Sequence, residues 1–282
     1  MKNNSKKIKL KNHKVFLPKA KMQVIISQLT VVASIFLFFS NVVNAEQIRV
    51  LFIGNSYTHM NNFPEIVANI GAEKGDMIYS DYSAIDNYTL EKHFSHSQTI
   101  EKIKEGCWDY VILQEQSQRP VMDSITFYEK TNHFANELTN LIYAYNPSAQ
   151  PILFLTWGRK LGDKELCKRF KWTCSYKEMQ KMLIHRYNLL GSKLALPVAP
   201  CGIAWEHFET NLLNHINLFH KDNSHPNEVG SYLNACIFYT VITGNSPVGT
   251  FYNPANLNEK DLQEIQAVAY KTIEMYLPMF LK

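Results

Sequence analysis

Two short segments, far apart in the chain, contain residue types that together can perform nucleophilic catalysis. Ser56 comes directly after a run of apolar residues and a Gly-Asn pair, whereas Asp222 and His225 lie near the C-terminus. A serine hydroxyl is a poor nucleophile until a base takes its proton, and histidine is the usual base. The histidine needs an acceptor that fixes its tautomer, which Asp222 can supply across a turn. If folding brings the two segments together, they can attack a carbonyl carbon.

Both segments also have an interpretation without chemistry. A buried strand must end in a turn, and Gly54-Asn55 makes one. Asp222 can likewise stabilise a turn, with His225 placed before a helix that Pro226 begins. The first segment matches neither a phosphate-binding loop nor the Gly-x-Ser-x-Gly elbow, because Thr58 stands where the second glycine would be. Residue types and spacing alone therefore leave both interpretations open.

The two segments together resemble the SGNH hydrolases, also called GDSL-type esterases. The resemblance rests on Ile-Gly-Asn-Ser at residues 53–56 and on Asp-x-x-His-Pro at residues 222–226, and it covers most of the chain after residue 45. It implies a flavodoxin-like, three-layer α/β/α fold with a parallel sheet, and ester hydrolysis through a serine acyl-enzyme. By this likeness Ser56 is the nucleophile, His225 the base and Asp222 its orienting carboxylate.

The resemblance also implies an oxyanion hole, although two of its segments differ from the family pattern. A family glycine after the second strand donates its backbone N–H, and Asn87 stands at the corresponding position here. Asparagine is the non-glycine residue that best tolerates a positive φ. The usual Gly-x-Asn-Asp is replaced by residues 114–117, Gln-Glu-Gln-Ser, in which Gln116 keeps an amide donor. We expect oxyanion contacts from the N–H of Ser56, the N–H near Asn87 and the Gln116 amide; the alternative is two ordinary polar loops.

Several other residues are candidates for substrate binding or for a rival base. Trp157 follows a predicted strand and can stack on a sugar ring or simply cap the core, and Gln114 is a further substrate-binding candidate. Residues 158–174 contain six Lys or Arg against two acidic residues, which suits either an anionic substrate or a solvated loop. His59 lies close to Ser56 but has no carboxylate near it in the sequence. The remaining histidines lack ligand-like spacing, so we expect no metal and no cofactor.

The segments between these residues alternate between strand and helix patterns. Strands are expected at 49–53, 77–82, 110–113, 152–156 and 196–199, and helices at 63–74, 90–94, 124–145, 176–194, 226–243 and 261–277. Continuous apolar strands that alternate with helices predict a parallel sheet covered on both faces. In such sheets the active crevice lies beyond the carboxyl ends of the strands, which is where Ser56 falls.

The N-terminal residues 1–45 read as a signal peptide, which leaves residues 46–282 as one domain. They combine eight Lys and no acidic residue with an apolar stretch at 24–39 and small residues before Glu46. The alternative is an uncleaved anchor, but a membrane-spanning helix needs about 20 apolar residues, more than residues 24–39 provide. Without this segment, 21 basic and 25 acidic residues remain, so the charge does not support nucleic-acid binding. Export permits disulfides, and Cys167 and Cys174, which flank a short polar loop, are the best candidate pair.

The sequence thus predicts an exported serine ester hydrolase, periplasmic or secreted. An acylated carbohydrate is the preferred substrate, given export and an aromatic residue at the rim. A lipid ester is the alternative within the same class. A non-catalytic carbohydrate- or surface-binding module on the same scaffold is the competing class, because residues 114–117 and Asn87 depart from the family pattern. The sequence does not set the oligomeric state.

Overall fold

The computed structural model describes residues 47–211 and 215–276. The chain divides into two units, Met1–Ala45 and Glu46–Lys282, and every described residue belongs to the second. The predicted signal peptide, residues 1–45, lies outside the described residues and stays a prediction. Within the described ranges, every helix is too short or too polar to cross a membrane.

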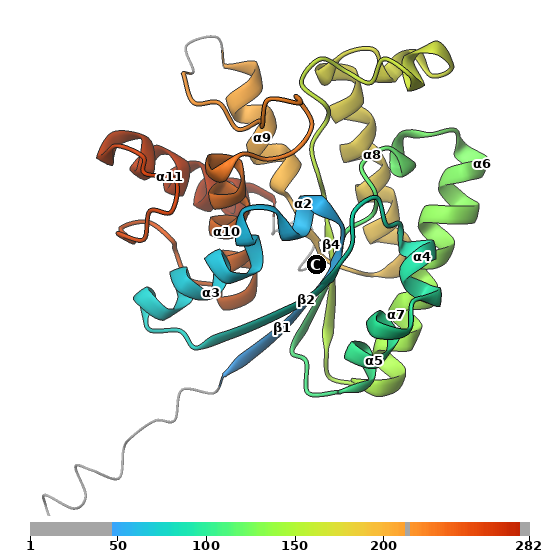
Figure 1. Ribbon diagram of the computed structural model, residues 1–282, viewed down its shortest axis with the longest axis horizontal. Coiled ribbons are helices and arrows are strands. Elements are labelled where there is room, and N and C mark those ends of the chain that lie inside the picture. Colours follow the sequence, from blue (N-terminus) through green and yellow to red (C-terminus); the bar gives the residue numbers. More distant parts are fainter. Residues whose placement is uncertain (1–46, 212–214, 277–282) are drawn as a thin grey trace, which may run out of the picture. The chain divides into compact units, whose positions relative to one another are not determined.

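The described residues contain a five-stranded parallel sheet with the strand order β2-β1-β3-β4-β5 (Figure 1). The strands are β1 (Ile48–Gly54), β2 (Ile78–Ala84), β3 (Tyr110–Leu113), β4 (Gln150–Phe154) and β5 (Val198–Ala199). Phe52 of β1 pairs with Tyr82 on one side and Ile112 on the other, which fixes the register at the centre of the sheet. The buried residues of the inner strands are apolar because both faces of these strands are covered.

Helices cover the two faces of the sheet and make two separate cores. Alternate side chains of β1 point to opposite faces, so Val50 and Phe52 enter one core and Leu51 and Ile53 the other. Figure 1 shows α3, α10 and α11 on one side of the sheet and α4, α5 and α7 on the other. The covering helices are α3 (Phe63–Lys74), α9 (Cys201–Thr210), α10 (Glu228–Thr243) and α11 (Glu259–Tyr276) on the first face, and α4 (Leu90–Ser95), α5 (Ser97–Lys104), α7 (His133–Tyr145) and α8 (Tyr176–Leu194) on the second. The predicted three-layer α/β/α fold is confirmed.

Short helical turns connect these elements, and several lie at the carboxyl edge of the sheet. They are α2 (Ser56–His59), η1 (Met60–Asn62), η2 (Arg119–Val121), α6 (Ser124–Thr126), η3 (Phe127–Asn132), η4 (Leu166–Lys168) and η5 (Lys171–Thr173). The single helix predicted at 124–145 is α6, η3 and α7 in succession, with a π-helical stretch in η3. The loops after β1, β2, β3 and β4 all meet at this edge because the strands are parallel.

A turn ahead of α10 brings the C-terminal part of the chain to the same edge. Phe219 and Pro226 form an isolated antiparallel bridge, and the N–H of His220 donates to the carbonyl of His225 at 2.8 Å. Asn223, at the tip, has a φ of 60°. Asparagine suits this left-handed position better than most residues. The bridge therefore presents residues 222–225 as a fixed tip.

Candidate active site

Ser56 lies on a sharp turn between β1 and α2. Asn55 caps α2, since its side-chain oxygen accepts the N–H of Tyr57 at 3.1 Å. Gly54 has no room for a side chain: a Cβ there would lie 2.3 Å from the Thr58 hydroxyl and 2.5 Å from the side-chain oxygen of Gln114. The side chains of Thr58 and Gln114 therefore pack closely against this turn. Ser56 is the first residue of α2.

The two segments singled out in the sequence meet at this turn. The Ser56 hydroxyl lies 2.8 Å from Nε2 of His225, although 169 positions separate the two residues. Nδ1 of the same imidazole contacts Oδ2 of Asp222. The structure thus brings together the hydroxyl, imidazole and carboxylate in the order that nucleophilic catalysis requires.

Asp222 is held as an ionised acceptor. Its Oδ1 accepts the backbone N–H groups of Ser224 and His225, both at 3.0 Å. Partial burial alone would raise the pKa of Asp222, but the hydrogen bonds from His225 and from these two N–H groups lower it to about 2. An ionised carboxylate can only accept, so Nδ1 of His225 carries the hydrogen and Nε2 is left to accept from Ser56.

A small cavity opens in front of Ser56, with a volume of about 40 Å³. It is lined by Asn55, Ser56, Tyr57, Asn87, Gln116, Ser117, Arg159, Ser224 and His225. Both of the residues expected to supply oxyanion donors, Asn87 and Gln116, are therefore in the same cavity wall as the nucleophile.

The two expected oxyanion segments have defined conformations. Asn87 has a φ of 59°, which is the left-handed conformation expected for a residue in the place of a glycine. The Gln116 side-chain oxygen accepts the backbone N–H of Gln118 at 2.9 Å and of Arg119 at 3.2 Å, and its Nε2 donates to the Gln118 side chain at 3.0 Å. An amide nitrogen carries two hydrogens, so one donor of Gln116 remains beyond this contact.

Two expected substrate-binding residues are buried and cannot contact a substrate. Trp157 is fully buried, stacked between Tyr57 at 4.8 Å and Trp205 at 3.7 Å between ring centroids. Of the two interpretations of Trp157, packing in the core is therefore correct and sugar stacking is wrong, because both faces of the indole are covered. Gln114 is also fully buried, and its oxygen accepts the N–H of Asn55 and the hydroxyl of Thr58, each at 2.9 Å. It supports the turn that carries Ser56 from below.

The expectation that His59 lacks a carboxylate is also wrong. Nε2 of His59 lies 2.7 Å from Oδ1 of Asp86, in the loop after β2. The two residues are 27 positions apart, so local sequence inspection missed the pair. His59 follows Ser56 in α2 and therefore forms a second histidine–aspartate pair near the nucleophile.

Sequence reasoning missed several residues that shape the cavity. The Tyr57 hydroxyl lies 2.7 Å from the Ser224 hydroxyl, and the Tyr57 ring meets the His225 ring edge to face at 5.3 Å. Burial raises the pKa of Tyr57, so its hydroxyl stays neutral. The only signal in the sequence was adjacency: Tyr57 follows Ser56, and Ser224 precedes His225.

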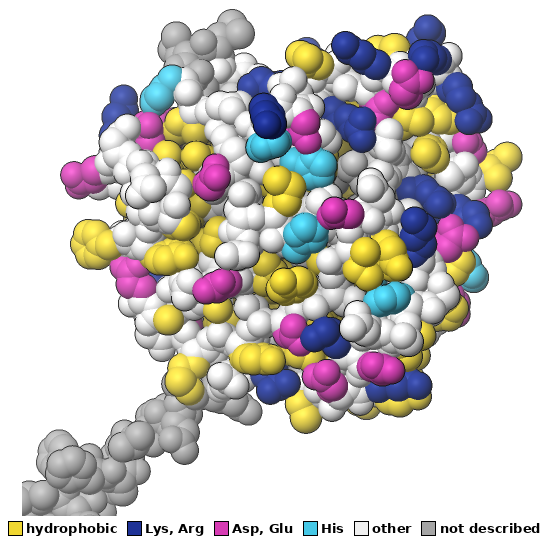
Figure 2. Space-filling model, in the orientation of Figure 1, with side chains coloured by type: hydrophobic (Ala, Val, Ile, Leu, Met, Phe, Trp, Pro, Cys, Tyr) yellow, Lys and Arg dark blue, Asp and Glu magenta, His cyan; other side chains and the backbone are white. Residues whose placement is uncertain are grey.

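Arg159 brings a positive charge to the cavity wall. Its Nη1 lies 3.0 Å from the buried carboxylate of Asp163, which also accepts from the Gln118 side chain at 2.6 Å. These contacts join the segment after β4 to the loop after β3. Lys and Arg side chains gather in the upper part of Figure 2, where Figure 1 draws this segment.

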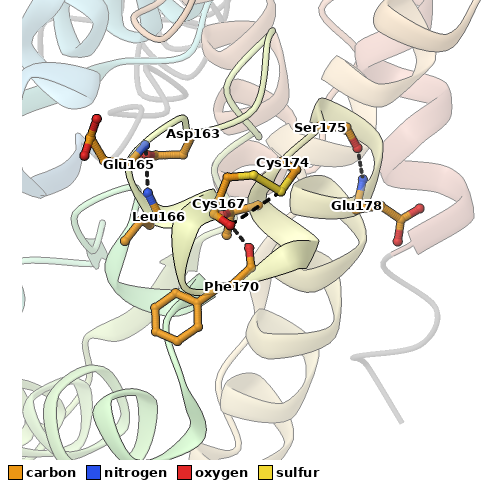
Figure 3. Close-up of a disulfide and its surroundings, with 9 residues drawn as sticks. Asp163, Glu165, Leu166, Cys167, Phe170, Cys174, Ser175 and Glu178 are labelled. Atoms are coloured by element: carbon orange, nitrogen blue, oxygen red, sulfur yellow. Dashed lines mark hydrogen bonds between the residues drawn. A yellow bond between two sulfur atoms is a disulfide. The ribbon is translucent and has the colours of Figure 1, made fainter.

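A disulfide closes the segment that follows Arg159. Cys167 and Cys174 are bridged, as the sequence led us to expect (Figure 3). Asp163 organises the same segment, since its Oδ1 accepts the N–H groups of Glu165 at 3.1 Å and Leu166 at 3.0 Å. In the described ranges, no group of three His, Cys, Asp or Glu side chains is arranged to hold a metal ion.

Comparison with family models and with curated proteins finds no match to the sequence. Solved structures do match. A DUF4886 family protein from Bacteroides uniformis has a TM-score of 0.70 over 82% of this chain and 96% of its own, at 16% identity. A protein from Slackia heliotrinireducens that is assigned to the SGNH hydrolases has a TM-score of 0.56 over 69% of this chain and 98% of its own, at 22% identity.

The acetyl xylan esterase AlAXEase has a TM-score of 0.51 over 69% of this chain and all of its own, at 13% identity. The chain has the SGNH hydrolase fold. The SGNH architecture places the loops after the strands at one edge of the sheet, and Ser56, Asn87 and Gln116 all lie in such loops here. At these identities the likeness extends to the fold, whereas the chemistry depends on the residues of this chain.

Proposed function

We propose that this chain is a serine ester hydrolase that removes a short acyl group from a carbohydrate. The observation that carries the proposal is the contact of the Ser56 hydroxyl with Nε2 of His225 at 2.8 Å, with Asp222 on the other ring nitrogen and a cavity in front. The fold supports the reaction class, since the similar structures include an acetyl xylan esterase and an SGNH hydrolase assignment.

The reaction begins when Ser56 Oγ attacks the ester carbonyl carbon and its proton passes to Nε2 of His225. Asp222 stabilises the imidazolium that results. The carbonyl oxygen gains negative charge and meets the N–H of Ser56, the N–H near Asn87 and the remaining amide hydrogen of Gln116. His225 then gives its proton to the leaving alcohol. Water attacks the acyl-enzyme by the same route, which releases the acid and restores Ser56.

The cavity volume favours a short acyl group over a lipid chain. The cavity of about 40 Å³ is far smaller than the roughly 300–1,000 Å³ that encloses a drug-sized ligand, so it suits a small acyl group such as acetyl. The cavity lining includes Tyr57, whose ring is stacked on Trp157. The residues around Ser56 therefore favour acetyl esters over long-chain lipid esters.

Export forms the other part of the proposal, and it rests on residues 1–45. Their basic start, apolar stretch and small residues before Glu46 support cleavage after Ala45. An exported enzyme with the bridge between Cys167 and Cys174 would act in a periplasm or outside the cell. Acylated carbohydrates are accessible substrates in both places.

The decisive experiment compares purified residues 46–282 with Ser56→Ala on 4-nitrophenyl acetate, butyrate and octanoate. Ser56→Ala should lower kcat by on the order of 10⁴-fold or more, because the acyl-enzyme cannot form. Ser97→Ala, which removes an exposed hydroxyl, is the matched control and should keep the wild-type rate. Equal rates for the wild type and Ser56→Ala would favour the non-catalytic binding module, and faster turnover of octanoate than acetate would favour the lipid esterase.

A further inference from the structure

A closed ring of buried hydrogen bonds lies beneath Ser56. The N–H of Asn55 donates to the side-chain oxygen of Gln114 at 2.9 Å, and the Gln114 amide donates to the carbonyl of Glu115. Oε1 of Glu115 accepts the N–H of Leu90 at 3.2 Å, at the start of α4. One turn further along α4, Nε2 of His93 lies 2.7 Å from the carbonyl of Gly54, which closes the circuit. We call residues 54, 55, 90, 93, 114 and 115 the support ring.

The support ring is shielded from water. His93 and Gln114 are fully buried, and Glu115 is 1% exposed. Hydrogen bonds in such surroundings are stronger than in water, and a missing partner is costly. The ring therefore holds its segments at fixed spacings.

His93 acts as a donor in this ring. A carbonyl oxygen can only accept, so Nε2 carries the hydrogen, and Nδ1 is left to accept from the Thr99 hydroxyl at 2.8 Å. Burial lowers the pKa of His93 to about 4, so its imidazole stays neutral in ordinary buffers. His93 thus fixes the carbonyl two residues before Ser56.

Glu115 joins the two loops that contribute Asn87 and Gln116 to the cavity lining. Its Oε1 accepts both the N–H of Leu90 and the N–H of Gln116, the latter at 2.7 Å. Leu90 follows the Asn87 loop directly, and the Asn55 side chain donates to the carbonyl of Tyr88 in that loop at 2.9 Å. One carboxyl group therefore sets the distance between the two segments expected to bind the oxyanion.

We propose that Glu115 is a positioning residue for ester hydrolysis: its carboxyl group sets the spacing of the Asn87 and Gln116 loops, and Gln114 and His93 link that spacing to the Ser56 turn. This inference rests on the proposed function, because an oxyanion is needed for the spacing to matter. Residues 114–116, which depart from the family pattern, then serve chiefly as a brace between loops, with the Gln116 amide as the one group that reaches the cavity.

Glu115 should also make the site sensitive to pH. Burial raises its pKa to about 7, against the hydrogen bonds from Gln116 and Leu90 and the charge of Arg119. Tyr187 of α8 and the Thr131 hydroxyl of η3 also face the carboxyl group, and Arg119 belongs to η2. Since the folded pKa lies above the unfolded value, folding favours the protonated form. Stability should therefore fall as the pH rises from about 4.5 through about 7.

The test compares Glu115→Gln and Glu115→Ala with Glu91→Ala, which removes a carboxylate from helix α4, next to Leu90 but outside the support ring. Glu115→Gln keeps an oxygen acceptor, so kcat at pH 6 should stay within about threefold of the wild type. Glu115→Ala should lower kcat by roughly 10- to 100-fold with KM changed by less than about threefold, because only the transition state uses the oxyanion contacts. Glu91→Ala should resemble the wild type. Equal losses for Glu115→Ala and Glu91→Ala would overturn the proposal.

A second measurement needs no turnover and so separates this inference from the proposed function. Urea unfolding between pH 4.5 and 8 should show the fall in stability in the wild type and in Ser56→Ala. Glu115→Gln should show a smaller fall, because an amide does not titrate; the fall that remains comes from other carboxyl groups whose pKa burial raises, such as Glu206 and Glu209. The same pH dependence in Glu115→Gln would overturn the assignment of the titrating group, whether or not any ester is hydrolysed. Failure of Ser56→Ala to lose activity would instead remove the ester hydrolase and leave the unfolding result standing.

Discussion

Two histidine–aspartate pairs lie near Ser56 and differ in how the carboxylate is held. His59 and His225 are equally exposed, at 31% of the side chain in each case. Asp86 is 70% exposed, whereas Asp222 is 41% exposed and also accepts two backbone N–H groups. His59 uses Nε2 for its aspartate, whereas His225 uses Nδ1 and keeps Nε2 for Ser56.

On the proposed function, His225 acts as the base through Nε2, the nitrogen that Asp222 leaves free, whereas the contact with Asp86 occupies Nε2 of His59. The tip at residues 222–225 holds Asp222 against Nδ1 through local backbone contacts. The His59 pair instead joins α2 to the loop after β2, next to Asn87. On the proposed function, proton transfer therefore belongs to His225 and Asp222, whereas His59 and Asp86 make a contact between α2 and the loop after β2.

The largest expected effect comes from replacing the imidazole in each of the two pairs. His225→Gln should lower kcat/KM for 4-nitrophenyl acetate by about 10⁴-fold or more, because Ser56 loses its base. His59→Gln, the matched control, should stay within about threefold of the wild type. Steady-state kinetics at pH 8 measure both. Comparable losses in the two variants would mean that the pair of His59 and Asp86 takes part in the chemistry.

A smaller effect is expected at the carboxylates. Asp222→Asn should lower kcat by roughly 10³- to 10⁴-fold, because an amide that donates to Nδ1 favours the wrong tautomer of His225. Asp86→Asn should change kcat by less than about threefold, since it touches only the exposed pair. The ratio of the two kcat values is the measurement, and a ratio near one would contradict the assignment of Asp222.

The smallest effect concerns acid stability. The pKa of Asp222 is about 2 in the folded chain against an ordinary value of 3.8, so its ionised form favours folding. This contribution is complete above about pH 4 and is lost as the pH falls through 2. The difference in urea midpoint between the wild type and Asp222→Asn should shrink as the pH is lowered from 6 to 3. Asp86→Asn, titrated in parallel, gives the change produced by the exposed pair, and a constant or growing difference for Asp222→Asn would refute the expectation.

Much of the fold was predictable because it depends on local periodicity. The apolar run before Ser56, the strand at 110–113 and the helices at 63–74 and 176–194 lie where the pattern put them. The helices α5 and α9 were missed. α5 is short and carries few apolar residues, and α9 contains Gly202, whose missing side chain lets the helix lie against the carbonyl of Thr156.

Only the part of the site that depends on residue type and order in the sequence could be predicted. The motifs placed Ser56, Asp222 and His225, since their chemistry depends on which residues they are. Nothing local showed that Trp157 is enclosed by two rings or that His59 faces Asp86, because both facts depend on residues distant in sequence. The support ring was hidden for the same reason: its members become neighbours only after three strands have paired.

The distance along the chain between Ser56 and His225 has a consequence for how the protein is made. A ribosome adds about 5–20 residues per second, so the 169 positions between them correspond to roughly ten to thirty seconds of synthesis. During that interval the growing polypeptide carries a hydroxyl without its proton acceptor. On the proposed function, partly made or prematurely ended copies would therefore be inert toward acylated metabolites of the cell that produces them.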